Sequence, residues 1–274
     1  MPADDLIDDH LIDTDRYPLH DTDGQRYREL VAASRAQLAS DGLVDLPGFL
    51  RDEPRMDDLA RLLPMFDSVA YAHARDHTIY FSDTVDGLEP TDGALVQLRT
   101  SNRTLCGDDL AGTAVDRVYR WPPLRRFVAD ICSLRDLHLL ADPLACLNAM
   151  AYGDGEALGW HFDRAGFTTT LLLQRPMVGG QFTYRKDLRT DADPNHDGVA
   201  RLLAGDDPEV RVVDPAPGTL TVFGGQHTPH CISPVEGDQL RVIVVLAFAG
   251  GADVSFSDED RRGFYGRHEP RQPG

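Results

Sequence analysis

The feature that most constrains the fold is a change in the residue pattern after Asp136. From there on, short runs rich in Val, Leu, Thr and Phe follow one another, separated by Gly, Pro and Asp. Such runs have the length and composition of β-strands. They cover residues 144–152, 167–173, 181–184, 210–213, 219–223 and 240–248. Closely spaced strands that follow a helical region predict an antiparallel sandwich or barrel buttressed by helices.

The first half of the chain is expected to supply those helices. Apolar residues recur at a rough helical period over residues 25–40, and residues 56–65 and 123–133 have the character of two further helices. Residues 43–50 indicate a short strand that runs into a turn. Residues 85–115 are rich in Asp, Gly and Thr, and we expect a long covering loop there.

The chain has 274 residues, enough for one large domain with a sizeable core. No internal repeat or low-complexity linker divides it, so we expect a single domain over residues 1–274, mainly β with flanking helices. Its expected parts are a loosely ordered acidic arm (1–23), helical support with covering loops (24–135), a strand-rich core (136–250) and a C-terminal segment available as a lid (251–274).

The charge balance bears on possible partners. The chain has 27 Lys+Arg against 45 Asp+Glu, a formal net charge of −18. A field of this sign repels phosphate backbones and anionic membranes, so we expect neither nucleic acid nor a membrane as a partner. The N-terminus is acidic where a secretory signal is basic and then apolar, and the four cysteines form no CxxC pair. These features favour a cytoplasmic protein, and none of them indicates a particular oligomeric state.

His161 and Asp163 lie one residue apart, just before the Thr- and Leu-rich run. Residues i and i+2 of a strand point to the same side, so one face would present an imidazole and a carboxylate. Such a pair is either an ordinary surface pair or half of a metal site whose third ligand comes from a distant strand. His230 is the best candidate, because its rival His227 lacks the Ser-Pro-Val sequel and lies farther from Arg241. Two imidazoles and one carboxylate form the facial triad of non-haem Fe(II) oxygenases, although zinc accepts the same ligands.

Arg241 opens a strongly apolar strand within residues 240–248. An arginine buried among Val and Leu needs an anion, because an unpaired charge is costly away from water. A dicarboxylate cosubstrate would supply that anion in bidentate geometry. Arg241 is therefore the candidate cosubstrate-binding residue.

Four sequence elements follow one another in a specific order and spacing: Tyr152-Gly153 nine residues before His161, HFD at 161–163, Gly179-Gly180, and HCISPV followed by Arg241. In these elements the chain resembles the Fe(II)- and 2-oxoglutarate-dependent oxygenase superfamily. The resemblance implies a double-stranded β-helix, a cupin-like jelly roll. It also implies iron held by His161, Asp163 and His230, with Arg241 on the far carboxylate of 2-oxoglutarate and O₂ as the oxidant.

A closer likeness is to the bacterial group of free-amino-acid hydroxylases and radical halogenases. Residues 148–189, ARDHTIYFSD at 74–83 and GFYGR at 263–267 carry it. In the halogenases of that group, glycine replaces the carboxylate ligand and opens a site for chloride, whereas this chain has Asp163. The likeness implies hydroxylation of a free amino acid or similar small polar molecule, with release of succinate and CO₂. The alternatives are hydroxylation of a peptide- or carrier-bound residue, radical halogenation, and a jelly-roll binding module that has lost catalysis.

Two further residues are candidates for contact with the cosubstrate. Asn148 and Tyr152 alternate onto one face of a strand that leads to the metal loop, where both could bind cosubstrate carboxylates. The competing interpretation is that Tyr152 is a core aromatic whose hydroxyl is satisfied within the protein.

Four residues are candidates for contact with the substrate. Arg75 and His77 lie in the upstream segment that the resemblance assigns to the substrate pocket, where Arg75 would pair with a substrate carboxylate. A surface ion pair of Arg75 with Asp76 or another acidic residue is the alternative. Tyr265 and Arg267 belong either to a solvated tail or to a segment that folds back over the site.

Overall fold

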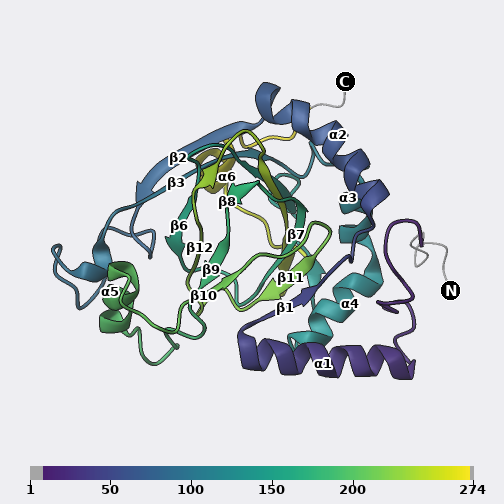
Figure 1. The fold of residues 1–274 in the computed structure, drawn as a ribbon, viewed down its shortest axis with the longest axis horizontal. Coiled ribbons are helices and arrows are strands. Elements are labelled where there is room, and N and C mark those ends of the chain that lie inside the picture. Colours follow the sequence, from purple (N-terminus) through teal and green to yellow (C-terminus); the bar gives the residue numbers. More distant parts are fainter. Residues whose placement is uncertain (1–8, 272–274) are drawn as a thin grey trace.

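The computed structural model describes residues 9–271, whose strands form two main antiparallel sheets (Figure 1). The larger sheet has seven strands. In spatial order they are β1 (Leu43–Leu46), β11 (Leu220–Phe223), β7 (Thr168–Gln174), β14 (Arg241–Leu246), β5 (Leu147–Tyr152), β3 (Leu98–Leu105) and β2 (Tyr71–His77).

The smaller sheet has four strands. In spatial order they are β10 (Arg211–Val213), β9 (Phe182–Tyr184), β12 (His230–Ile232) and β6 (Leu158–His161). Two short pairs join β13 (Val235–Glu236) to β8 (Val178–Gly179) and β15 (Phe248–Ala249) to β4 (His138–Leu139). The two main sheets make the double-stranded β-helix, so the expected mainly β jelly roll with flanking helices is confirmed.

Four helices gather on one side of the molecule, beside the larger sheet (Figure 1). They are α1 (Gln25–Asp41), α2 (Asp52–Ser68), α3 (Ala114–Arg120) and α4 (Pro122–Ile131). A fifth helix, α5 (His196–Ala204), packs against the short 3₁₀ helix Gly93–Leu95 on the other side, and α6 (Asp258–Tyr265) contacts β2. The larger sheet thus has one face covered by helices and one face turned toward the smaller sheet.

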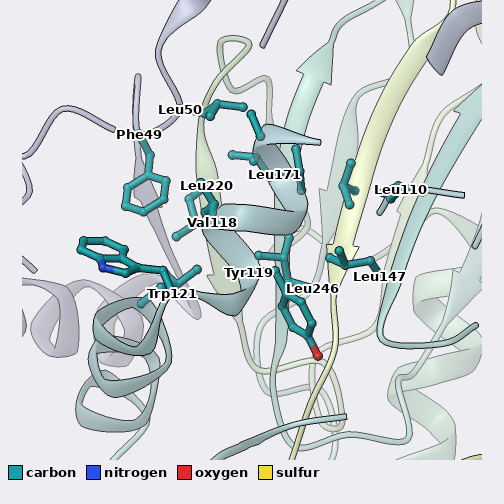
Figure 2. Close-up of a cluster of buried hydrophobic side chains, with 14 of the residues drawn as sticks. Phe49, Leu50, Leu110, Val118, Tyr119, Trp121, Leu147, Leu171, Leu220 and Leu246 are labelled. Atoms are coloured by element: carbon teal, nitrogen blue, oxygen red, sulfur yellow. The ribbon is translucent and has the colours of Figure 1, made fainter. Parts of the chain in front are cut away.

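The main hydrophobic core lies between these helices and the larger sheet (Figure 2). Side chains of α3 and its C-cap meet side chains of the sheet there, and these include Val118, Tyr119, Trp121, Leu147, Leu171, Leu220 and Leu246. Leu147, Ala149 and Ala151 of β5 are fully buried in this core. Because strand residues alternate, Asn148 and Tyr152 face the opposite side, toward the interior of the jelly roll.

The helix ends follow from local chemistry. Gly42 ends α1 in the left-handed conformation, with φ +82°, which glycine adopts without a steric penalty. Pro122 stands at the start of α4, where a missing N–H costs nothing. The buried carboxylate of Asp58 accepts hydrogen bonds from the backbone N–H groups of Ala114 and Val115 at 2.9 and 3.0 Å, which ties α2 to the first turn of α3.

The expected helices at 25–40, 56–65 and 123–133 are confirmed, as are the six expected strand runs. The prediction of a long covering loop at 85–115 is wrong, because this range contains β3. β3 alternates polar residues on both faces, so it lacks the apolar periodicity that marks a strand. β2, α3, α5 and α6 are likewise structured segments that the pattern did not indicate.

The expected loosely ordered arm at 1–23 falls in two parts. Residues 1–8 lie outside the described residues. Residues 9–23 differ from the expectation, because Leu11, Ile12 and Leu19 are buried in the main core. Ile12 also forms a β-bridge with Leu50. Over residues 9–271, no helix combines the length and apolar character needed to cross a bilayer.

Candidate metal centre

Two histidines from distant parts of the chain meet across the smaller sheet. His161 ends β6 and His230 begins β12, and these residues are direct partners in the antiparallel register. Both are buried, and their ring centroids lie 4.2 Å apart. The pairing of β6 with β12 therefore delivers two imidazoles to one point inside the jelly roll.

Asp163 completes a group of three. Its Oδ1 atom lies 3.4 Å from Nε2 of His161 and 3.6 Å from Nε2 of His230. The ligand atoms of the three residues all lie within 4.8 Å of one another. The structure thus brings together the three predicted metal ligands. His227 is elsewhere, with its Nε2 atom 3.0 Å from Oδ1 of Asp191.

Backbone carbonyls set the tautomer of both histidines. Nδ1 of His161 lies 3.0 Å from the carbonyl oxygen of Gly159, and Nδ1 of His230 lies 3.1 Å from that of Thr228. Each Nδ1 must carry the proton and donate it, because a carbonyl oxygen only accepts. The lone pair of each Nε2 therefore points toward the group of three, as a metal ligand requires.

Burial and neighbouring groups shift the pKa values of His230 and Asp163. Burial lowers the pKa of His230 to about 4, so the ring is neutral at pH 7. Burial alone would raise the pKa of Asp163, but the neighbouring His230, His161 and Thr168 hold it below its usual range. A neutral His230 and an ionised Asp163 are protonation states that metal binding needs. This donor set fits Fe(II), and zinc would accept it as well.

Arg241 is a buried cation with an unfilled donor. It is 2% exposed, and its Nε donates to the carbonyl oxygen of Gly180 at 2.9 Å. Its Nη1 is buried without a hydrogen-bond partner among residues 9–271. Burial lowers its pKa to about 10, which still leaves it charged at pH 7. A buried guanidinium with a free N–H fits an anionic ligand, since leaving the donor unpaired is costly.

The two candidate cosubstrate contacts differ from each other. Tyr152 is the register partner of Arg241, is buried, and places its hydroxyl 4.0 Å from Sδ of Met150. Asn148 is already engaged, since its amide donates to the carbonyl oxygens of residues 144 and 147 and accepts from the Tyr265 hydroxyl. Its side-chain amide is thus used within the protein, which differs from the expected contact with the cosubstrate.

Arg75 lies close to the group of three and is not paired with Asp76. Its guanidinium carbon lies 4.4 Å from the ring centroid of Phe81, and that ring lies 5.7 Å from the ring of His161. Asp76 pairs instead with Arg99 at 3.2 Å. Nε of Arg75 is buried with no hydrogen-bond partner in the described part of the chain. Arg75 is therefore a second cation with a free donor.

His77 supports the wall of this region. Its Nε2 lies 2.7 Å from the Thr100 hydroxyl, and its Nδ1 lies 2.8 Å from the carbonyl oxygen of Thr78. Its ring packs 4.5 Å from that of Phe81. Both ring nitrogens are thus engaged within the protein, and the ring packs against Phe81, which differs from the expected contact with the substrate.

Tyr265 and Arg267 anchor the C-terminal segment, which is neither a solvated tail nor a source of free donors. Tyr265 is buried, and its hydroxyl donates to Oδ1 of Asn148 at 3.0 Å. The guanidinium of Arg267 pairs with Asp108 at 2.6 Å and with Asp109 at 3.2 Å. These contacts differ from the expected role in substrate binding, because they commit both side chains to the protein itself.

Sequence reasoning did not assign two residues that touch Asp163. The Thr168 hydroxyl donates to Oδ2 of Asp163, and the backbone N–H of Asp163 donates to the carbonyl oxygen of Gly225 at 3.1 Å. The consecutive glycines Gly224 and Gly225, shortly before His230, were the available signal, since paired glycines often mark a close backbone approach.

The family model described as Halogenase D matches residues 91–262 of the chain. No curated protein sequence matches significantly.

Among solved structures, AviO1 from Streptomyces viridochromogenes Tue57 is similar, with a TM-score of 0.54 at 16% identity, covering 82% of this chain and 96% of that one. The epimerase SnoN, solved in complex with Fe³⁺, alpha ketoglutarate and nogalamycin RO, has a TM-score of 0.53 at 15% identity, covering 81% of this chain and 84% of that one. At such identities the likeness is one of fold.

Proposed function

The chain belongs to the halogenase D family, and within it we propose that this protein is an Fe(II)- and 2-oxoglutarate-dependent dioxygenase. The proposed reaction hydroxylates an unactivated C–H bond of a free amino acid or a similar small polar molecule. Substrate, 2-oxoglutarate and O₂ are consumed, and hydroxylated substrate, succinate and CO₂ are formed. One oxygen atom of O₂ enters the product and the other enters succinate, so the atoms balance.

The observation that carries the proposal is the joint presence of a facial triad and a buried arginine with a free donor. Nε2 of His161, Oδ1 of Asp163 and Nε2 of His230 would hold the iron. Nε2 of each histidine is available to a metal, because the Nδ1 atom of each ring donates its proton to a backbone carbonyl oxygen. Bound iron, together with 2-oxoglutarate and O₂, supplies the oxidising power that no protein side chain has.

Arg241 would bind the distal carboxylate of 2-oxoglutarate. Its Nε is held by Gly180, which orients the guanidinium and leaves Nη1 for the ligand. Gly180 lies two residues before Phe182, whose ring centroid is 5.5 Å from that of His230, so this arginine reaches the same end of the jelly roll as the ligands. A charge-assisted pair at a buried position is strong and specific for a carboxylate.

Arg75 would bind a carboxylate of the substrate. It lies beyond Phe81 from His161, and its buried Nε lacks a partner among the described residues. Burial, followed by the nearby charge of Arg164, lowers its pKa, and an anion would relieve both costs. A buried cation with a free donor at this position supports an amino acid or a similar small acid as the substrate.

Aromatic rings would exclude water from the reacting centre. Phe223 and Phe182 lie 4.8 and 5.5 Å from the ring of His230, and Phe81 lies 5.7 Å from that of His161. A dry wall strengthens the ionic contacts of the site and protects a reactive oxidant from side reactions.

The family's description raises halogenation as the second candidate function. Asp163 counts against it, because a carboxylate ligand occupies the position that a halide would need. The other alternative, hydroxylation of a residue on a peptide or carrier, differs from the proposal in substrate size.

The proposal is tested by screening the free amino acids for 2-oxoglutarate turnover with Fe(II) under air. Succinate is quantified, and products are analysed by mass spectrometry, with the His230→Ala variant as the matched control. We expect one or a few amino acids to stimulate succinate release and to gain one oxygen atom. Wild-type protein that gives no more succinate than His230→Ala with any amino acid would contradict the proposal.

A further inference from the structure

We infer that Thr168 is a positioning residue that keeps Asp163 bound to the metal through one oxygen atom and so preserves an open coordination position. The inference rests on the iron site proposed above. It concerns a residue outside the ligand set, and it follows from the two unequal environments of the Asp163 carboxylate.

The two oxygen atoms of Asp163 have different neighbours. Oδ1 faces Nε2 of both histidines, at 3.4 and 3.6 Å. Oδ2 accepts the hydrogen bond of the Thr168 hydroxyl. The carboxylate is therefore divided, with one oxygen directed toward the metal position and the other held by a neutral donor.

Gly225 forms the wall behind this carboxylate. A Cβ atom added at Gly225 would lie 2.7 Å from both Cβ and Cγ of Asp163, closer than real Cβ contacts. The carbonyl oxygen of the same glycine accepts the backbone N–H of Asp163 at 3.1 Å. The nearest atom to that Cβ position is Oδ2 of Asp163, the oxygen that accepts the Thr168 hydrogen bond. The carboxylate therefore occupies the space that a side chain at residue 225 would fill, with Thr168 holding the same oxygen.

The position of Thr168 is set by the larger sheet. It is the first residue of β7 and pairs in register with Phe223 of β11, whose ring packs against His230. A hydroxyl on a paired strand is a better-placed donor than one on a free loop. Thr170 lies two residues further on the same face of β7 and makes no contact of this kind, so it is a matched control.

The count of coordination positions shows why one oxygen matters. His161, Asp163 and His230 would supply three ligands to a bound iron and leave its other positions open for the cosubstrate and O₂. If Oδ2 of Asp163 also bound the metal, one of those open positions would be filled. By holding Oδ2, Thr168 would keep it open.

The test measures an open position directly and does not depend on turnover. Full-length protein is loaded anaerobically with Fe(II) and 2-oxoglutarate and titrated with nitric oxide, which occupies the O₂ position and gives a characteristic electron paramagnetic resonance signal. Thr168→Val, Thr168→Ser and Thr170→Val are compared with the wild type, and circular dichroism checks that each variant is folded. Valine has the shape of threonine and favours strands, so β7 should be retained.

We expect Thr168→Val to weaken the apparent affinity for nitric oxide by about 10–100-fold, the size of the loss in metal affinity or activity that removal of an outer-shell partner typically causes. Thr168→Ser, which keeps the hydroxyl, and Thr170→Val should stay near the wild type. Wild-type affinity in Thr168→Val, or equal damage in Thr168→Ser, would overturn the role of Thr168. If the wild type itself bound no Fe(II), the proposed function would fall and the inference with it, so the two failures are distinguishable.

Discussion

His161 and His230 stand directly opposite each other on antiparallel strands β6 and β12, with ring centroids 4.2 Å apart. The register of this pair shifts between His230 and Ile232, but β12 also pairs with β9, where His230 is the partner of Tyr184. The meeting of the two imidazoles is therefore a property of paired strands and not of a flexible loop. Asp163 follows β6 by two residues and is held by Gly225, so the third ligand depends on the same pairing.

The first prediction separates two neighbouring histidines. His230→Ala should abolish high-affinity Fe(II) binding, because it removes one of three ligand atoms from a buried group. His227→Ala should leave Fe(II) binding intact, since His227 contacts Asp191 and lies outside that group. Isothermal titration of metal-free protein with Fe(II) under nitrogen checks both variants. The reverse pattern would show that the third ligand is misassigned.

The second prediction concerns the cosubstrate. Arg241→Ala should raise the KM for 2-oxoglutarate strongly. Loss of one partner of a buried charged pair costs on the order of 2–5 kcal/mol of binding free energy. Arg175→Ala is the control, because Arg175 is half-exposed and pairs with Asp214. Initial rates of succinate formation at varied 2-oxoglutarate measure both. An unchanged KM in Arg241→Ala would mean that another cation holds the carboxylate.

The parts of the fold that face the hydrophobic core could be predicted from the sequence, because burial leaves an apolar pattern. β7 and β14 are examples, since Leu171 and Val244 are fully buried. β3 could not, because Thr100 and Asn102 on one of its faces are buried polar residues, and Arg103 on the other pairs with Asp67 of α2. A strand that is polar on both faces carries no amphipathic signal.

The candidate site divides in the same way. The spacing of His161, Asp163 and His230 suggests metal ligands, because ligand chemistry depends on residue type and strand alternation. The roles of Thr168 and Gly225 depend on how the start of β7 and the segment between β11 and β12 approach Asp163, which no local pattern encodes. Arg267 is a residue whose type suggested a role that the structure does not bear out. Its charge made it a candidate for substrate binding, but it forms ion pairs with Asp108 and Asp109.

The third prediction uses Asp142, a buried carboxylate that ties the C-terminal segment to the sheet. Its Oδ2 accepts hydrogen bonds from the backbone N–H of Phe256 and from Nε of Arg261, both at 2.9 Å. Burial alone would raise the pKa of Asp142, but these donors and the backbone N–H groups of Ala145 and Leu144 hold it below its usual range. Asp142→Asn should lower the free energy of unfolding by on the order of 2–3 kcal/mol at pH 7, because Arg261 loses its buried carboxylate partner and keeps the longer contact with the exposed Asp258.

The sign of the pH dependence follows from the lowered pKa of Asp142. The unfolded carboxyl has a pKa near 3.9 and takes up a proton at higher pH than the folded one does. The stabilisation is therefore fully present above about pH 4 and is lost as the pH falls through the folded pKa. Urea unfolding of wild type and Asp142→Asn between pH 7 and pH 3 should show the difference in free energy shrinking below about pH 4. A difference that is constant or grows would contradict this assignment.

The fourth prediction compares two adjacent glycines. Gly225→Ala should weaken metal binding, because its Cβ would lie 2.7 Å from Cγ of Asp163 and displace the carboxylate. Gly224→Ala should be tolerated, since its Cβ would meet only the carbonyl oxygen of Gly166, at 3.9 Å. Co(II) affinity, followed by its visible absorption, measures the effect. Equal affinity in the two variants would show that Asp163 can move without loss of binding.

The last prediction concerns the outcome of the reaction and depends on Asp163. With three protein ligands and two atoms of 2-oxoglutarate on an octahedral metal, one position is left, and O₂ requires it. No position remains for chloride, so the wild type should hydroxylate its substrate even in saturating chloride. Asp163→Gly removes a ligand and frees the Thr168 hydroxyl, whose partner in the wild type is Asp163.

Efficient chlorination by Asp163→Gly does not follow from a vacant position alone. The substrate radical must also be held closer to the halide than to the hydroxyl group, and the substitution does not move the substrate. We therefore expect Asp163→Gly to lose hydroxylation with little or no chlorinated product. Mass spectrometry of both proteins after turnover in high chloride checks this, because chlorine leaves a distinct isotope pattern. That pattern in the main product of the wild type would reject hydroxylation as its reaction.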